Sequence, residues 1–108
     1  MTIDNTFGDQ TDVFRIGNKM FALLNSDART LTVKTAPSES VALQEKYSSV
    51  KPGYYMNKTH WITIDLNGNV PASVARELID NAYTLVFESL TKKQKAAIAL
   101  SRTSPAVE

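Results

Sequence analysis

The chain has 108 residues, 43% of them hydrophobic and 21% charged, which is the size of one compact domain and too short for a two-domain enzyme. It contains no cysteine, so thiol nucleophiles, iron–sulfur clusters and thiolate zinc sites are excluded. Its formal net charge is +1 and its pI is about 8.0, below the roughly pI 9 of a strongly basic nucleic-acid-binding domain. Any nucleic-acid site must therefore be a local patch.

The first ten residues do not resemble a signal peptide, because no basic segment is followed by an apolar stretch. The longest apolar runs, 20–24 and 96–100, have only five residues, far fewer than a membrane-spanning helix needs. We expect a soluble, cytoplasmic protein without membrane contact. We expect one domain over residues 1–108, with flexible ends at 1–11 and 101–108.

Three antiparallel strands are predicted in the first third of the chain. The first twelve residues contain three aspartates and no Lys or Arg, which predicts a solvated lead-in and regular structure starting near Asp12. Apolar segments flank Gly17-Asn18, a pair typical of a two-residue β-hairpin turn. Residues 30–35 alternate with period two and are rich in β-branched side chains, which predicts a third strand with Leu31 and Val33 facing inward.

The middle of the chain predicts a short helix and a further strand. Pro37 and Glu39 are typical of a helix start, and the helix is expected to end near Tyr47. Residues 48–59 have no helical period and predict a loop or an irregular edge strand. Residues 60–66 alternate again and predict a strand, followed by a tight turn at Asn67-Gly68. Ile62, Ile64 and Leu66 are expected on one side of this strand.

The last third predicts two helices. After Pro71, apolar residues three and four positions apart indicate one long amphipathic helix that packs over the sheet; they are Ala75, Leu78, Ile79, Ala82, Leu85, Val86 and Leu90. Thr91 and Gln94 have the spacing of a capping box, which predicts a second helix through Leu100. The fold class is therefore α+β. An antiparallel sheet, made of a three-strand meander, a helix and one or two further strands, is covered by a long C-terminal helix in the order β-β-β-α-β-β-α-α.

Basic and aromatic residues alternate in the segment between Glu45 and Asp65, which contains no acid. They are Lys46, Lys51, Lys58 and His60 with Tyr47, Tyr54, Tyr55 and Trp61. Lysines release counterions from phosphates and flat rings stack on unpaired bases, so this pattern suits nucleic acid. The alternative is solvated lysines beside half-buried packing aromatics. A second basic cluster, Lys92, Lys93, Lys95 and Arg102, would extend the same positive face if the two clusters lie side by side.

His60 is the only imidazole and the obvious candidate for acid–base chemistry. Asp65 lies five residues further along the same predicted strand, about 16 Å away at the rise of a β-strand. No neighbouring carboxylate can therefore orient the ring for general-base catalysis. We expect no enzymatic activity, no metal site and no cofactor, and a structural His60 whose ring hydrogen-bonds a backbone group of the Pro-Gly loop.

Two blocks of residues resemble the MmcQ/YjbR family of small bacterial proteins. One is 17–22 (Gly-Asn-Lys-Met-Phe-Ala), which follows Phe7-Gly8. The other is 52–61 (Pro-Gly-Tyr-Tyr-Met-Asn-Lys-Thr-His-Trp), followed by Gly68, Val70-Pro71 and a helix from Leu78-Ile79 to Tyr83. The resemblance spans about residues 7–93. It implies an α+β fold similar to the bacterial frataxin-like (CyaY-like) and secretion-chaperone-like architectures, and the family's usual label of a double-wing DNA-binding protein.

The sequence departs from the family pattern at two places. Tyr55 stands where the family usually has a histidine, which weakens any metal or proton chemistry shared with His60. The family also usually begins with a helix before the Phe-Gly pair, whereas six residues precede Phe7 here. Without that helix, part of the sheet would be uncovered. The resemblance therefore implies altered packing, self-association or a shortened chain.

The leading hypothesis is a small non-enzymatic module that binds DNA. Lys51 and Lys58 would hold phosphates, Asn57 would hydrogen-bond backbone or base, and Tyr54 or Tyr55 would stack. The full candidate site is Lys51, Tyr54, Tyr55, Asn57, Lys58, Trp61, Lys92 and Lys93, with Pro52, Gly53, Met56 and His60 as its structural motif.

Two other readings of the same block remain open. Its exposed rings could form the centre of a protein–protein interface, since Tyr, Trp and Met are enriched there. The block could also be purely structural. As a partner we therefore expect DNA or alternatively a protein, and the chain itself is expected to be a monomer or a weak homodimer.

Overall fold

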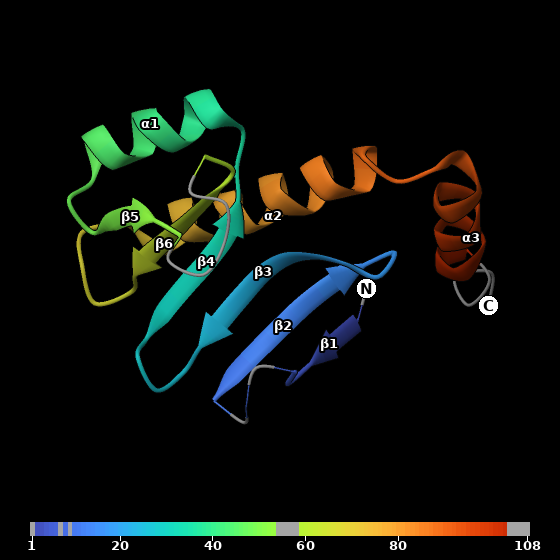
Figure 1. Cartoon of the computed structure of the whole chain (residues 1–108), viewed down its shortest axis with the longest axis horizontal. Helices are drawn as coiled ribbons and strands as arrows, with labels where there is room; N and C mark the ends of the chain where they lie inside the picture. The colour runs from blue at the N-terminus through green and yellow to red at the C-terminus, as the bar shows by residue number, and fades with distance from the viewer. Residues whose placement is uncertain (1, 7, 9, 54–58, 104–108) are drawn as a thin grey trace.

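The computed structural model describes residues 2–6, 8, 10–53 and 59–103, and within the last helix the side chains up to Ile98. The regular elements are, in chain order, β1 (Thr2–Asp4), β2 (Thr11–Ile16), β3 (Lys19–Asn25), β4 (Thr30–Lys34), α1 (Pro37–Lys46), β5 (Val50–Pro52), β6 (Trp61–Asp65), α2 (Ala72–Glu88) and α3 (Lys92–Thr103). Figure 1 follows them along the chain. The predicted α+β class and element order are confirmed, with one additional strand at the N-terminus.

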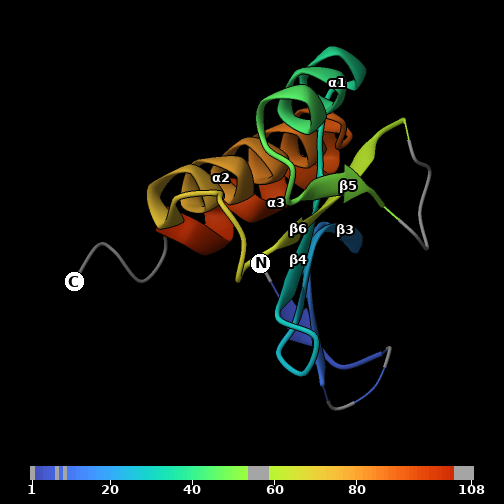
Figure 2. The ribbon, with the colours of Figure 1, turned by 90° about the vertical axis from the view of Figure 1, so that its left-hand side faces the viewer.

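The six strands form one antiparallel sheet in the order β1-β2-β3-β4-β6-β5. After β4 the chain passes through α1, forms the edge strand β5, and returns as β6 between β4 and β5. Helix α2 packs on one face of the sheet, against β2, β3 and β4, and α1 packs beside β5. Figure 2 turns the sheet nearly edge-on, with α2 on one side of it. We call the face opposite α2 the outer face.

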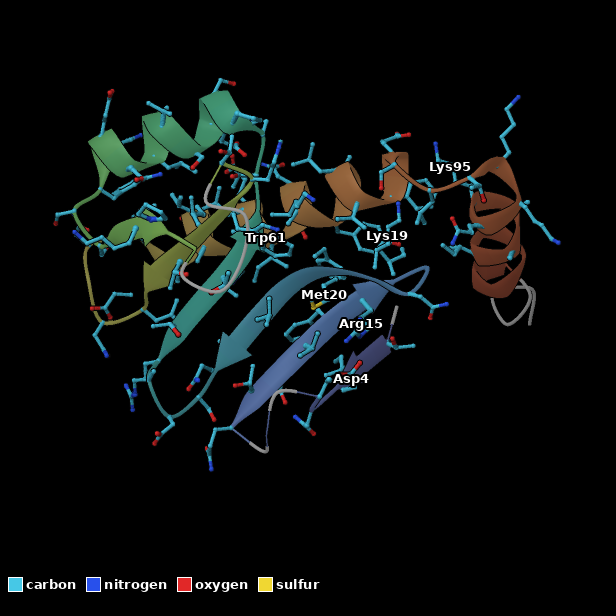
Figure 3. The ribbon with its side chains drawn as sticks, viewed as in Figure 1. Asp4, Arg15, Lys19, Met20, Trp61 and Lys95 are labelled. Carbon is cyan, nitrogen blue, oxygen red and sulfur yellow. The ribbon has the colours of Figure 1, made fainter. Side chains whose placement is uncertain are left out.

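Strand β1 corrects the predicted start of regular structure near Asp12. Ile3 pairs with Phe14 and Asp4 with Val13 on β2. The Arg15 side chain donates to the Asp4 carboxylate at 2.7 Å, and Figure 3 shows the two side chains pointing toward each other. These contacts hold β1 in place through β2, a separate strand. The N-terminal residues themselves are mostly polar, so their own sequence does not indicate a strand.

The predicted hairpin between β2 and β3 is confirmed at Gly17 and Asn18, both of which have positive φ (57° and 66°), as a type I′ turn requires. The pairing of the two strands contains a β-bulge, since Phe14 pairs with Ala22 but Arg15 pairs with Met20. The extra residue, Phe21, is only 2% exposed. Its ring packs edge-to-face on Tyr83 of α2, with centroids 5.4 Å apart. The bulge therefore adds an aromatic residue to the core.

The core lies between α2 and the central strands. Leu31 and Val33 on β4 face inward as predicted, and they pair with Ile64 and Ile62 on β6. The buried side of α2 carries Ala75, Leu78, Ala82 and Val86. Ile62 and Ile64 are fully buried, whereas Leu66 is 41% exposed because β6 ends at Asp65. Leu85, predicted on the apolar stripe of the long helix, is 39% exposed on α2.

The predicted helix ends agree closely with the structure. Helix α1 ends at Lys46 with Tyr47 as its C-cap. The capping box before α3 is formed, since the Thr91 amide donates to Oε1 of Gln94 at 3.0 Å and the Gln94 amide donates to Oγ1 of Thr91 at 3.1 Å. Helix α3 continues to Thr103, three residues beyond its predicted end at Leu100. Within the described part of the chain, no helix is long and apolar enough to cross a membrane.

Candidate functional site

The two ends of the Pro52–Trp61 block meet where β5 leads out of the sheet and β6 re-enters it. The Gly53 amide donates to the Trp61 carbonyl at 2.9 Å. A Cβ atom at Gly53 would lie 2.8 Å from Cβ of Trp61, closer than two such atoms ordinarily approach. Glycine is therefore required here by the close approach of the two strands.

His60 is held by its backbone. Its carbonyl accepts a 2.8 Å hydrogen bond from the amide of Thr35, one residue after β4, and the residue is partly buried. This bond continues the β4–β6 pairing by one step beyond Lys34 and Trp61. The predicted hydrogen bond from the imidazole ring to the Pro-Gly loop stays a prediction.

Trp61 is buried, with 7% of its surface exposed. It lies directly opposite Lys34 on β4, and the Lys34 ammonium lies 5.5 Å from the centroid of the indole ring. Because Trp61 alternates along β6 with the core residues Ile62 and Ile64, it lies on the outer face of the sheet. This corrects the expectation of an exposed Trp61 ring at a binding surface, because in this conformation little of the ring faces solvent.

A row of side chains crosses the outer face from β3 to β5. Leu23 pairs with Thr32, Thr32 with Thr63, and Thr63 with Lys51. The two threonine hydroxyls are 3.0 Å apart and hydrogen-bonded, and Lys51 is exposed. Neither Lys51 nor Lys34 forms an ion pair with any described residue. We call Lys34, Lys51, Thr32 and Thr63 the outer-face patch.

Five residues of the candidate site and its motif lie outside the described residues. They are Tyr54, Tyr55, Met56, Asn57 and Lys58. Their predicted roles in stacking, hydrogen bonding and phosphate contact therefore stay predictions. The described ends of the block, at Gly53 and Thr59, join it to the β5–β6 end of the sheet.

The second basic cluster lies at the opposite end of the molecule. Lys92 and Lys93 are exposed in the first turn of α3, whereas Lys51 lies on β5. Figure 1 places these two elements at opposite ends of the longest axis, which extends 44 Å. Lys95 is engaged locally, since it donates to Glu88 at 3.1 Å. The two clusters therefore do not form one continuous positive face.

An apolar groove on the α2 side of the sheet was not predicted. It has a volume of about 380 Å³ and opens between the first half of α2 and the strands β2, β3 and β4. Its lining is Phe14, Leu24, Leu31, Leu66, Val70, Ala72, Ala75, Arg76 and Ile79.

The titratable side chains of the described residues are dispersed over the fold. No group of three or more His, Asp or Glu side chains among them could hold a metal ion. His60 lines neither the apolar groove nor a shallower hollow formed by Ala36, Glu39, Asn81, Thr84 and Leu85. The carboxylate whose pKa is clearly shifted, Asp4, has a lowered pKa because Thr6 and Arg15 donate hydrogen bonds to it. That ion pair joins β1 to β2.

Comparison with known proteins identifies relatives of the whole fold. The uncharacterized protein YbdF of Escherichia coli O157:H7 is 37% identical over 95 residues, covering 85% of this chain and 77% of that protein. The uncharacterized protein YjbR of Escherichia coli K12 is 26% identical over 83 residues, covering 75% of this chain and 70% of that protein.

Solved structures agree with these sequence relatives. The crystal structure of Deinococcus radiodurans protein DR2400, with a DUF419 domain, has a TM-score of 0.82 at 33% identity and covers 91% of this chain and 77% of its own. A Pseudomonas syringae crystal structure has a TM-score of 0.66 at 31% identity, covering 78% of this chain and 85% of its own. The family model described as YjbR matches residues 1–85. Because that match spans all six strands and α2 up to Leu85, the chain belongs to the YjbR family.

Proposed function

We propose that this protein is a small non-enzymatic module that binds nucleic acid, DNA in the first place, through the outer-face patch and the adjoining β5–β6 segment. The observation that carries the proposal is the pair Lys34 and Lys51, which come from separate strands to a sheet face that α2 does not cover. Neither lysine has an acidic partner among the described residues.

The physical basis of such binding is the release of counterions from phosphates by lysine ammonium groups. The hydroxyls of Thr32 and Thr63, which lie on the same face, are suited to hydrogen bonds with phosphate or sugar oxygens. Two phosphate contacts predict a slope of about −1.8 for the logarithm of the affinity against the logarithm of the salt concentration with duplex DNA, and about −1.4 with single strands. Binding by this patch is therefore weak and depends on salt.

Charge reversal at Lys51 tests the proposal. Labelled single-stranded and duplex DNA are titrated with the protein and followed by fluorescence anisotropy at low and physiological salt. Lys51→Glu is expected to weaken binding about tenfold and to make the salt slope shallower. Lys93→Glu, at a lysine that is also exposed but lies on α3 at the other end of the molecule, is the matched control and is expected to change affinity by less than about twofold.

Two outcomes would overturn this assignment. The wild-type protein could show no saturable binding to either form of DNA at low salt. Alternatively, Lys93→Glu could abolish binding while Lys51→Glu leaves it intact, which would move the contact to α3. Circular dichroism spectra of both variants establish that each is folded.

Protein–protein interaction is a second candidate function, and the apolar groove between α2 and β2–β4 favours it. An open apolar surface is typical of sites that bind another macromolecule. Salt separates the two candidates, because binding to phosphates weakens steeply as salt rises whereas binding through apolar side chains does not.

A further inference from the structure

We propose that the apolar groove is a self-association surface, occupied by the same surface of a second copy of this chain. The proposal does not depend on nucleic-acid binding, because the groove and the outer-face patch lie on opposite faces of the sheet. It deepens the second candidate function, protein–protein interaction, because it assigns a second copy of this chain as the partner.

The groove is a continuous apolar surface. Its floor is formed by Phe14, Leu24 and Leu31, which come from three adjacent strands. Its wall on α2 includes Ile79, and Leu66, after β6, lies at its margin with 41% of its surface exposed. Ile3, which pairs with Phe14, continues this surface to the edge strand β1 and is 54% exposed. Covering these side chains removes apolar surface from water, which favours association.

Two charged side chains, Arg76 and Asp12, share the side of the sheet on which this surface lies. Arg76 projects from α2 and lines the groove. Asp12 lies directly opposite Leu24 on the neighbouring strand and so shares the face of the sheet that Leu24 occupies. The Asp12 carboxylate accepts a 2.9 Å hydrogen bond from Asn5. Within the described part of the chain, neither Arg76 nor Asp12 forms an ion pair.

This distribution of charge favours a second copy as the occupant. In a two-fold symmetric interface the same patch is used twice, so it must contain both members of every complementary pair. This surface does so, since Arg76 lines the groove and Asp12 lies beside its floor residue Leu24. In a symmetric dimer Arg76 of each copy would pair with Asp12 of the other. A nucleic acid would instead meet the unfavourable charge of Asp12.

The first test measures the oligomeric state of the full chain. Sedimentation equilibrium from about 1 to about 100 µM covers the range of weak to moderate dimers. The mass is expected to rise with concentration from the 11.9 kDa of the monomer toward twice that value. A mass that stays at the monomer value throughout would overturn the proposal, and so would open-ended growth beyond a dimer.

A matched pair of variants then locates the interface. Leu66→Arg places a charge at the groove and is expected to raise the dissociation constant of the dimer about tenfold or more. Leu85→Arg introduces the same charge at a leucine of nearly equal exposure, 39%, that does not line the groove. It is expected to change the constant by less than about twofold. Equal effects of the two variants would place the contact elsewhere.

Exchange of the charges at Arg76 and Asp12 tests the proposed pairing. It uses two single variants and their double variant, so the result does not rest on one variant that could misfold. Arg76→Asp and Asp12→Arg are each expected to weaken the dimer, because each places like charges opposite one another. The double variant restores the opposite charges and is expected to recover association to within about threefold of the wild-type constant. Single variants that weaken the dimer without recovery in the folded double variant would refute the pairing. The DNA titrations described above have a separate readout, so the two proposals can fail independently.

Discussion

Replacement of Trp61 by alanine distinguishes a buried tryptophan from an exposed binding residue. Trp61 is 7% exposed and packs beneath the ammonium group of Lys34. Truncation of a buried tryptophan to alanine costs about 3–5 kcal/mol, from lost burial and from the cavity that remains. Domains of this size have a total stability of about 5–15 kcal/mol. Trp61→Ala is therefore expected to remove a large part of the free energy of unfolding.

Urea unfolding followed by far-ultraviolet circular dichroism measures this change, since the variant lacks the only tryptophan of the chain. Val41→Ala, at an apolar side chain that is 58% exposed on α1, is the control and should stay within about 0.5 kcal/mol of the wild type. Lys34→Met keeps most of the aliphatic stem and removes the charge over the ring, with an expected loss of about 0.5–1 kcal/mol.

A different result would contradict the burial of Trp61: Trp61→Ala would lower the free energy of unfolding by less than about 1 kcal/mol and would weaken DNA binding as strongly as Lys51→Glu does. Trp61 would then be an exposed contact residue. If Trp61→Ala fails to fold, Trp61→Phe keeps an aromatic ring in the site and is expected to fold with a smaller loss of stability.

Two further predictions concern the β5–β6 junction and strand β1. Gly53→Ala is expected to lower the free energy of unfolding by about 1–3 kcal/mol, because the added methyl group overpacks a close strand contact; a thermal midpoint equal to that of the wild type would contradict this. The pKa of Asp4 is lowered from its usual 3.8 by hydrogen bonds from Thr6 and Arg15. The stabilising effect of Asp4 is therefore present above that usual value and is lost as the pH falls through the lowered pKa. Asp4→Asn should abolish this acid-dependent loosening of β1 in NMR amide-exchange measurements, and unchanged exchange would count against it.

Features encoded by residues close together in the sequence were predicted well. The Gly17-Asn18 turn, the alternation that buries Leu31 and Val33, and the capping box of Thr91 and Gln94 each depend on residues a few positions apart. In each case the local backbone conformation and the tertiary structure favour the same arrangement, so a pattern of a few residues was sufficient.

Features created by distant contacts were missed. Strand β1 has only one apolar side chain, Ile3, and it forms by pairing with β2. The predicted turn at Asn67-Gly68 is confirmed, since the Gly68 amide donates to the Asp65 carbonyl at 3.0 Å, but the contact of Gly68 with Ser49 was missed. In the structure a Cβ atom at Gly68 would lie 2.3 Å from Cβ of Ser49, so a tight contact between two loops requires glycine there. The distance between Lys51 and the lysines of α3 likewise depends on the path of α2, which residue spacing does not determine.

The β-bulge in the β2–β3 hairpin also determines how the protein tolerates insertions and deletions. Because Phe21 is the extra residue, its deletion would leave the Phe14–Ala22 and Arg15–Met20 pairs in register, whereas a deletion in the regularly paired part of β3 would turn the side chains beyond it to the opposite face. The Gly17 carbonyl, which accepts a 3.4 Å hydrogen bond from the Gln94 side chain, would keep its alignment with α3. Loss of Phe21 would instead remove the aromatic contact with Tyr83 from the core, and homologous chains that change length within this hairpin should do so at the bulge.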